Sequence, residues 1–296
     1  MNNFNLLDYK KYFLAFSGSL TIIAIVLVSI FGFKPGIDLQ GGAEWAIKSE
    51  VSGFEIKAAE KLAEIIDAPV TVRHLGDGTA ILRLPATTET EHRAYEVKLK
   101  EIGEFTEVGF TSVGPTIGAE LRSRAITAMI LVLLAISLYI AFSFRKASKP
   151  VTSWKYGLIT LVTLAHDVII PAGMLAVLGK FMGIEMDTNS IVALLVVMGF
   201  SVHDTIVVFD RIREHLVRGE TGDLAGIVNR SVRETFVRSI NTSLTLVLVL
   251  VALLVWGPES MFYFTLTILV GTVFGTYSSI FVASPLLYLW GKNASR

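Results

Sequence analysis

Residues 188–209 read TNSIVALLVVMGFSVHDTIVVF. Most residues in this run are apolar, and the run reaches the roughly 20 residues that an α-helix needs to cross a bilayer. It therefore predicts a membrane-spanning helix. One acidic residue, Asp204, lies inside the run. Because a charge in the hydrocarbon core costs free energy, an acid at this position indicates a functional site.

The rest of the chain shows the same apolar character. Of its 296 residues, 52% are hydrophobic and only 18% are charged, which leaves more apolar surface than one globular core can hide. This composition argues against a soluble enzyme and predicts a membrane protein. Six runs approach or exceed the length of a membrane span, and they lie near residues 12–32, 125–144, 155–179, 188–209, 241–256 and 262–290.

The charges of the chain balance overall but are unevenly distributed. The 26 Lys and Arg match 26 Asp and Glu, so no basic field favours nucleic acid. Basic residues gather near both termini and in the connections after the second and fourth spans, and short basic connections tend to stay in the cytoplasm. We therefore expect both termini in the cytoplasm. The chain has no cysteine, and His74 and His92 of the polar region lack ligand-spaced partners, so we expect no metal site.

Residues 33–122 form a polar insertion that the predicted orientation places outside the cytoplasm. Ser52 with Glu55 and Thr88 with Glu91 are spaced as capping boxes at the starts of two helices. Gly76-Asp77-Gly78 is typical of a hairpin turn. Strand patterns precede, separate and follow the helices, at residues 43–48, 70–75, 79–84 and 104–113. This order predicts an α+β ferredoxin-like domain.

The chain thus divides into three expected parts. Residues 1–32 hold the N-terminus and the first membrane helix, residues 33–122 the extracytoplasmic domain, and residues 123–296 a bundle of five further membrane helices. Near residues 212–238, apolar residues alternate with arginines. This pattern is typical of an amphipathic helix on the inner membrane surface. It is equally typical of a helix packed on the protein's own cytoplasmic loops.

Polar residues inside the spans fall on helical stripes, which turn inward if they line a common polar core. His166 and His203 each precede an aspartate in the chain. The stripes are Thr160, Thr163 and Asp167 in the third span, Ser201 and Asp204 in the fourth, and Arg238, Thr242 and Thr245 at the start of the fifth.

We expect Asp204 and Asp167 to relay protons, because purely structural contacts could be made by uncharged groups. The residues expected to support them are His166, His203, Ser201, Thr163, Arg238 and Thr242. The alternative is that these polar side chains hydrogen-bond across helices and only fix the packing. In the sixth span, Gly271, Gly275 and Ser279 are four residues apart and predict a face for close helix packing.

Several strings of the sequence resemble those of a known family. They are GIDLQGG (36–42), VGPTIGAEL (113–121), AHD (165–167), GFSVHDTIVVFDRIRE (199–214) and GTYSSIFVASPLL (275–287). In these strings, and in its order of one span, an external domain and five spans, the chain resembles the SecF family of protein-export membrane subunits. This family is a branch of the RND superfamily, so the resemblance implies an RND-type half bundle of six transmembrane helices.

The resemblance also implies partners and an activity. It implies a complex with a SecD-like subunit at a SecY-type channel, with unfolded exported polypeptide as the substrate and the lipid bilayer as the surroundings. Proton flow, or sodium flow in its place, would drive export, and no other cofactor is implied. Asp204 matches the family's intramembrane acid and Asp167 its supporting residue. The first motif contributes Gly36, Asp38, Gly41 and Gly42.

We therefore expect an accessory subunit of the Sec translocase in the cytoplasmic membrane, without enzymatic activity of its own. One alternative is a half-transporter that exports lipid or small amphiphiles. Another is a passive scaffold that stabilises the translocation channel. An intramembrane aspartyl protease is disfavoured, because the Gly-x-Gly-Asp pattern expected beside one aspartate is absent: Asp204 follows Ser201, Val202 and His203.

Overall fold

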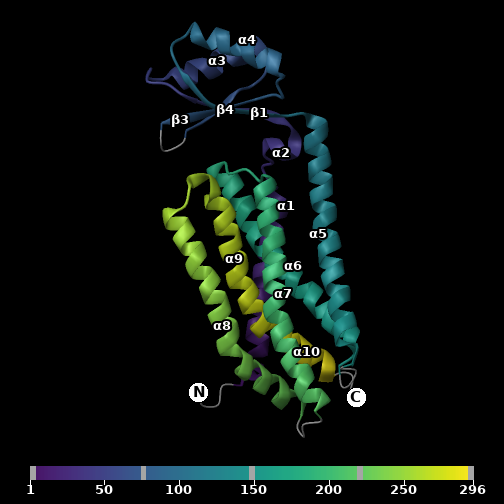
Figure 1. The fold of residues 1–296 in the computed structure, drawn as a ribbon. Coiled ribbons are helices and arrows are strands. Elements are labelled where there is room, and N and C mark those ends of the chain that lie inside the picture. The colour runs from purple at the N-terminus through teal and green to yellow at the C-terminus, as the bar shows by residue number, and fades with distance from the viewer. Residues whose placement is uncertain (1–4, 75–77, 147–150, 219–222, 293–296) are drawn as a thin grey trace. The chain divides into compact units, whose positions relative to one another are not determined.

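The computed structural model describes residues 5–74, 78–146, 151–218 and 223–292 (Figure 1). The chain divides into two compact units, one of residues 1–34 and 127–296 and the other of residues 35–126. The first unit is built from long helices, and the second contains a four-stranded sheet. Gly76 and Asp77 of the predicted turn lie outside the described residues.

Within the described residues, six helical segments are long and apolar enough to cross a membrane, which confirms the six predicted spans. Several helices extend beyond the apolar runs, because backbone hydrogen bonding continues into polar turns. The six are α1 (Lys10–Phe31) after a short 3-10 turn (Leu6–Tyr9), α5 (Pro115–Ser143), α6 (Ser153–Met182), α7 (Thr188–Val217), α8 (Leu224–Trp256), and α9 (Phe262–Ser278) together with α10 (Ser284–Lys292).

Helices α6, α7 and α9 form the enclosed part of the bundle and pack against one another. Helix α1 packs on α6 and helix α8 on α7 and α9. The approach of α1 to α6 is close, since a Cβ added to Gly173 would lie 2.8 Å from Ala24 Cβ. Small residues at such contacts let helix backbones approach and gain van der Waals packing.

The sixth span is interrupted between α9 and α10 by a π-helical turn, Ser279–Ala283. Pro285 follows this turn. A proline has no backbone N–H, and its ring clashes with the carbonyl four residues earlier in a regular α-helix. The wider π turn relieves that clash, and π turns of this kind often lie at functional sites.

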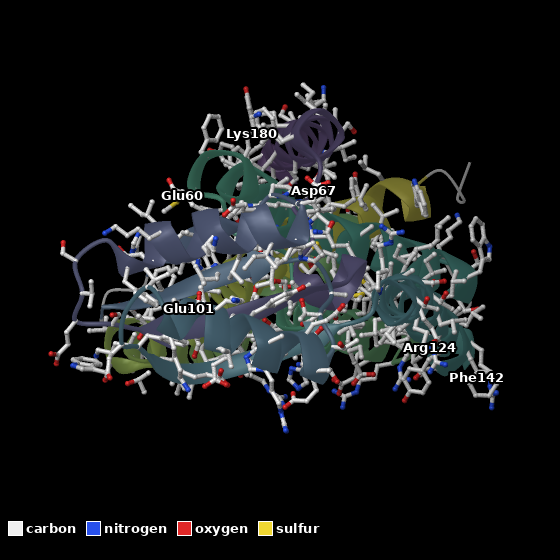
Figure 2. The ribbon with its side chains drawn as sticks, turned by 90° about the horizontal axis from the view of Figure 1, so that it is seen from above. Glu60, Asp67, Glu101, Arg124, Phe142 and Lys180 are labelled. Atoms are coloured by element: carbon white, nitrogen blue, oxygen red, sulfur yellow. The ribbon has the colours of Figure 1, made fainter. Side chains whose placement is uncertain are left out.

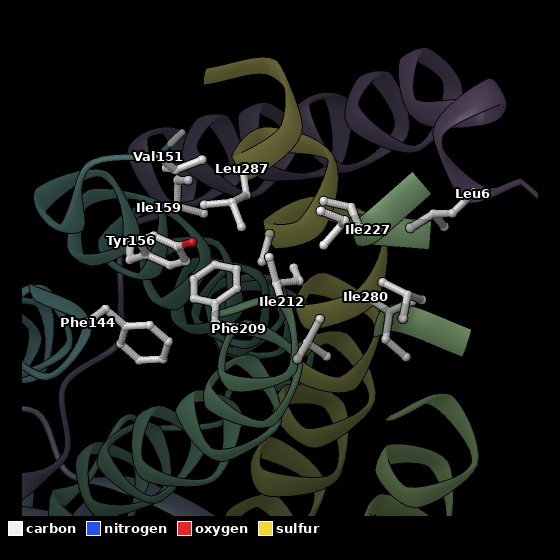
Figure 3. Close-up of a cluster of buried hydrophobic side chains, with 14 of the residues drawn as sticks. Leu6, Phe144, Val151, Tyr156, Ile159, Phe209, Ile212, Ile227, Ile280 and Leu287 are labelled. Carbon is white, nitrogen blue, oxygen red and sulfur yellow. The ribbon is translucent and has the colours of Figure 1, made fainter. Parts of the chain in front are cut away.

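A cluster of buried apolar side chains joins the helices at the end of the bundle that holds Leu6 (Figure 3). Within it, Tyr156 and Phe209 are in edge-to-face contact, with ring centroids 5.2 Å apart. Helices α6, α7, α8 and α10 all contribute to it, with Ile159, Ile212, Ile227, Val228 and Leu287 among its members. This cluster fixes the helix ends relative to one another.

The cluster corrects one expectation. Residues 212–238 do not form a separate amphipathic helix: residues 212–217 complete α7, and residues 224–238 begin α8. Ile227, Val228 and Val232 are buried in the cluster. Because the bundle's own helices cover these side chains, they are not available to lie on a membrane surface.

Residues 35–126 fold around an antiparallel sheet of strand order β2-β3-β1-β4, the order of a ferredoxin-like domain. The elements are α2 (Ile37–Gln40), β1 (Gly42–Lys48), α3 (Phe54–Ile66), β2 (Thr71–His74), β3 (Thr79–Leu84), α4 (Glu89–Lys100) and β4 (Thr106–Val113). Alternate residues of β1, namely Ala43, Trp45 and Ile47, enter a core with Phe54 and Leu62 of α3. Charged side chains such as Glu60 of α3 lie on the outside (Figure 2).

Of the two predicted capping boxes, one forms and the other does not. Thr88 and Glu91 form theirs at the start of α4. At α3 the N-cap is Gly53, whose φ of +71° lies in the left-handed region, so the helix begins one residue later than Ser52 would require. The Ser52 and Glu55 box is therefore not formed, because glycine reaches this backbone conformation without steric cost.

Candidate functional site

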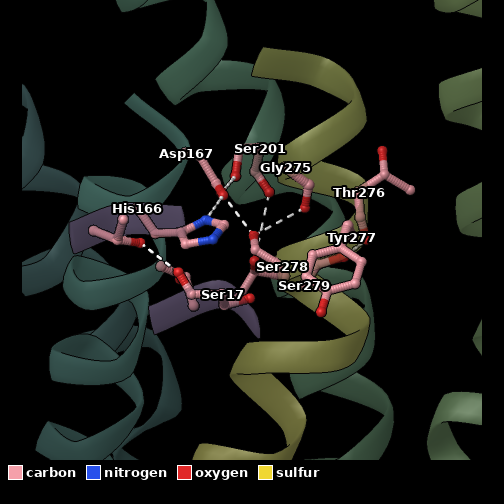
Figure 4. Close-up of polar contacts among 12 residues, drawn as sticks. Ser17, His166, Asp167, Ser201, Gly275, Thr276, Tyr277, Ser278 and Ser279 are labelled. Carbon is pink, nitrogen blue, oxygen red and sulfur yellow. Dashed lines mark hydrogen bonds and ion pairs between the residues drawn. The ribbon is translucent and has the colours of Figure 1, made fainter. Parts of the chain in front are cut away.

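Asp167 of α6 lies at a point where three helices meet (Figure 4). Its side chain is fully buried. Oδ2 accepts hydrogen bonds from Ser201 of α7 and from Ser278 of α9, the latter at 2.7 Å. Oδ1 lies 2.7 Å from Nδ1 of His166. One carboxylate thus links α6, α7 and α9.

Asp204 of α7 forms a second buried centre. Ser243 of α8 donates to its Oδ2 at 3.0 Å, and Thr276 of α9 donates to Ser243 Oγ at 2.6 Å. Among the described residues, no Lys or Arg lies within ion-pair distance of either Asp204 or Asp167. Hydroxyl groups, and not fixed cations, therefore hydrogen-bond both carboxylates, and His166 adds a nitrogen 2.7 Å from Asp167.

Two of the hydroxyls that contact a carboxylate can donate instead to a carbonyl of their own helix. Ser243 Oγ lies 3.0 Å from Asp204 Oδ2 and 2.9 Å from the carbonyl oxygen of Ser239. Ser278 Oγ lies 2.7 Å from Asp167 Oδ2 and 3.1 Å from the carbonyl oxygen of Gly275. A serine hydroxyl carries a single proton and can donate only one strong hydrogen bond at a time. A charged carboxylate accepts the serine's hydrogen bond across the helices. A protonated one can donate to the serine, which then donates to the carbonyl of its own helix.

The glycines of the sixth span bring α9 against α7. A Cβ added to Gly275 would lie 2.9 Å from Ser201 Cβ, and one added to Gly271 would overlap Val197. The small-residue face predicted in this span thus packs closely on α7. Ser279, its third member, donates to the carbonyl oxygen of Thr276 within its own helix at 2.9 Å.

The structure separates the two predicted histidines. His166 is buried beside Asp167, whereas the side chain of His203 is 57% exposed and its Nδ1 lies 3.8 Å from Asp204 Oδ1. Thr160 and Thr163 are buried, but they donate to carbonyls of their own helix and to neither carboxylate. Of the four, only His166 hydrogen-bonds a central acid.

One predicted stripe was wrong. Arg238, Thr242 and Thr245 are exposed on the surface of α8, and both threonines donate to carbonyls of their own helix. Ser239 and Ser243 of the same helix face inward instead. The two stripes are adjacent along α8, and a rotation of about 100° per residue exchanges which of them meets the core. Packing on α7 and α9 selects the serine stripe.

Ser243, Thr276 and Ser278 were not among the predicted site residues. Ser239 and Ser243 do stand four apart in the sequence, which is a stripe of the kind used for the other helices. The hydroxyls of α9 lie beside the glycines that indicated close packing. The sequence pattern did not show which hydroxyls reach a carboxylate, because that depends on helix rotation.

The first sequence motif lies in the unit of residues 35–126. Gly36 precedes the short helix α2, Asp38 lies in its first turn and Gly42 begins β1. Gly41 has a φ of +87°, and a Cβ there would lie 2.6 Å from the Pro115 Cα at the start of α5. The motif therefore provides a tight backbone crossing between α2 and α5, and glycine is required for it.

Comparison with known proteins places this architecture in a family. The family model of the C-terminal region of the protein export membrane proteins SecD and SecF matches residues 94–293. The protein translocase subunit SecF of Thermobaculum terrenum is 40% identical over 97% of this chain and 93% of that protein. The chain belongs to the SecF family. It is thus a multi-pass membrane protein and a protein translocase subunit.

A second SecF relative and a solved structure support the same family assignment. SecF of Anaerolinea thermophila is 35% identical over 99% of this chain and 96% of that protein. The crystal structure of SecDF, a translocon-associated membrane protein from Thermus thermophilus, superposes with a TM-score of 0.82 at 33% identity. It covers 98% of this chain, and this chain covers 39% of it. The SecF fold therefore also occurs as one part of a longer chain.

Proposed function

We propose that this chain acts with a SecD-like subunit to promote protein export across the cytoplasmic membrane, using the proton motive force. Its substrate is unfolded polypeptide, and the partner channel is of the SecY type. The Thermus thermophilus relative named SecDF carries the matching region within a single longer chain, which supports a SecD partner. The basic residues near both termini support a cytoplasmic location for these ends and an external one for residues 33–122.

The observation that carries the proposal is the site of Asp204. Its carboxylate is buried in a membrane-spanning helix, is not paired with Lys or Arg among the described residues, and is held by Ser243. A carboxylate in such surroundings is costly while it is charged, and proton binding removes the charge. Asp204 is therefore the proposed proton carrier, with Asp167 and His166 as a second proton-binding centre.

Protonation would change contacts between helices. While charged, Asp204 accepts a hydrogen bond from the Ser243 hydroxyl. Once protonated, Asp204 donates to Ser243 Oγ, and the Ser243 hydroxyl donates instead to the carbonyl oxygen of Ser239. The contact between α7 and α8 changes with it. One charge moving through 100 mV supplies about 2.3 kcal/mol, and an interhelical hydrogen bond in a membrane is worth about 0.6 to 1.7 kcal/mol. One proton can therefore drive a change in helix packing.

The test is export into vesicles that contain this chain with its SecD-like partner and the channel. With an imposed proton gradient, Asp204→Asn should abolish the gradient-dependent part of export while leaving the protein folded. Asp210→Asn is the matched control, because Asp210 is on the same helix but pairs with Arg213 outside the polar centres. Gradient-dependent export that survives in Asp204→Asn rejects the proton-carrier role. A response to a sodium gradient alone would replace protons by sodium.

A further inference from the structure

A cavity of about 440 Å³ lies beside α8 at the end of the bundle that holds Leu6. Its walls are mainly apolar and include Val232 and Phe236 of α8 and Ile280 and Phe281 of the π turn. Among the described residues that line it, Arg233 has the one charged side chain. The cavity takes no part in the polar centres around Asp167 and Asp204.

A second hollow, of about 280 Å³, continues from this cavity between α8 and α9. Ile280 and Phe281 line both, so the two adjoin. The second hollow ends beside Val247. At 1.5 Å per residue, α8 covers about 21 Å between Arg233 and Val247. One leaflet has a hydrocarbon thickness of roughly 15 Å, so this apolar crevice is long enough for an acyl chain.

Arg233 differs from the arginines near it. Arg211 and Arg213 of α7, and Arg218 directly after it, each form an ion pair with Asp or Glu. Within the described part of the chain, no carboxylate lies within ion-pair distance of Arg233, which donates from Nε to the carbonyl oxygen of Asn229 at 3.3 Å. A guanidinium group has five donors and binds phosphate oxygens in a bidentate manner.

We propose that this crevice binds one anionic phospholipid, with the phosphate on Arg233 and an acyl chain along α8 and the π turn. Arg233, which has no carboxylate partner in the described part of the chain, supplies the charge complementarity, and the apolar walls supply the surface for the chain. Ser243 and Thr276 line the second hollow, so the bound chain lies against the hydroxyls at the Asp204 centre. The lipid site does not depend on the proton role proposed above.

The experiment is native mass spectrometry of the full chain, purified in detergent and titrated with phosphatidylglycerol, phosphatidylcholine or glycerol phosphate. Phosphatidylglycerol should be retained, phosphatidylcholine more weakly, and glycerol phosphate not at all. Arg233→Gln should weaken phosphatidylglycerol binding by about fivefold, the effect expected for one basic residue at an anionic lipid. Arg238→Gln should leave it unchanged, because Arg238 is exposed on the same helix but does not line the cavity.

A second variant tests the crevice itself. Val237→Trp places a large ring at the wall of the cavity without changing the charge, and it should also lower retention of phosphatidylglycerol. Equal retention by wild type, Arg233→Gln and Val237→Trp overturns the proposal. Binding of glycerol phosphate as strong as that of the lipid would also overturn it, since the site would then take a free anion. Circular dichroism of each variant confirms that its helices are intact.

Discussion

The Ser243 hydroxyl of α8 lies 3.0 Å from Oδ2 of Asp204 on α7. It is the hydrogen bond through which the outer helix α8 contacts the buried acid. Thr276 of α9 donates to the same hydroxyl, so the three helices share one small polar centre. A centre built from hydroxyls can reverse the direction of its hydrogen bonds when the acid gains a proton, which a centre built on a fixed cation cannot do.

Ser243→Ala should weaken both the bundle and its proton response. The change removes the donor to Asp204 and the acceptor of Thr276, and the free energy of unfolding should fall by about 0.6 to 1.7 kcal/mol. Ser239→Ala is the control, because Ser239 Oγ has no hydrogen-bond partner in the described part of the chain. Unfolding in lipid bicelles and gradient-driven export measure the two effects. Equal losses of stability and of gradient-driven export in both variants would show that the hydrogen bond to Asp204 contributes to neither.

His166→Leu should impair gradient-driven export far more than His203→Leu. His166 is buried 2.7 Å from Asp167, whereas His203 is largely exposed. A hydrogen bond to a charged group is worth roughly 1.5 kcal/mol or more, so we expect about a tenfold loss for the first variant. Export into vesicles at fixed gradient measures the difference. A larger loss in His203→Leu would place the relay on the other histidine.

Gly275→Ala should separate α9 from α7. The added Cβ would lie 2.9 Å from Ser201 Cβ, and overpacking of this kind costs about 1 to 3 kcal/mol. Gly199→Ala on α7 is the control, since a Cβ there meets nothing within 4 Å. The midpoint temperature of thermal unfolding should fall for Gly275→Ala. For Gly199→Ala it should stay the same or rise, because alanine favours the helix more than glycine does. Two equal shifts would contradict the close contact.

The backbone amides in the first turn of α4 should lose protection from hydrogen exchange in acid. The backbone N–H of Thr88 and then its hydroxyl bind the Glu91 carboxylate and hold its pKa below the ordinary value. The ionised carboxylate therefore stabilises the folded form above the unfolded pKa of about 4.3, and this contribution disappears as the pH falls through the lower folded pKa.

Hydrogen exchange of the full chain, corrected for the intrinsic pH dependence of exchange, measures this effect in α4. Glu91→Gln should remove the acid-dependent loss of protection in the first turn. Glu60→Gln, a change on the exposed face of α3, should retain it. Persistence of the loss in Glu91→Gln would assign it to another group.

Sequence patterns predict the number of membrane helices, the alternating elements of the ferredoxin-like domain and the identity of the buried acids. These features follow from apolar run length, from the periods of 2 and 3.6, and from the cost of a charge in lipid. The capping box of Thr88 was also predicted correctly, because it depends only on neighbouring residues. The predicted box of Ser52 does not form, since Gly53 takes the N-cap position of α3 instead.

Which polar faces meet depends on how the helices pack. This packing turns Ser243 inward and Arg238 outward, places Ser278 on Asp167, and buries His166 but not His203. In a membrane, the lipid-facing side of a helix is as apolar as its packed side, so hydropathy gives the length of a helix but not its rotation about its axis. That rotation is set by contacts such as Gly275 against Ser201, which join segments far apart in the chain.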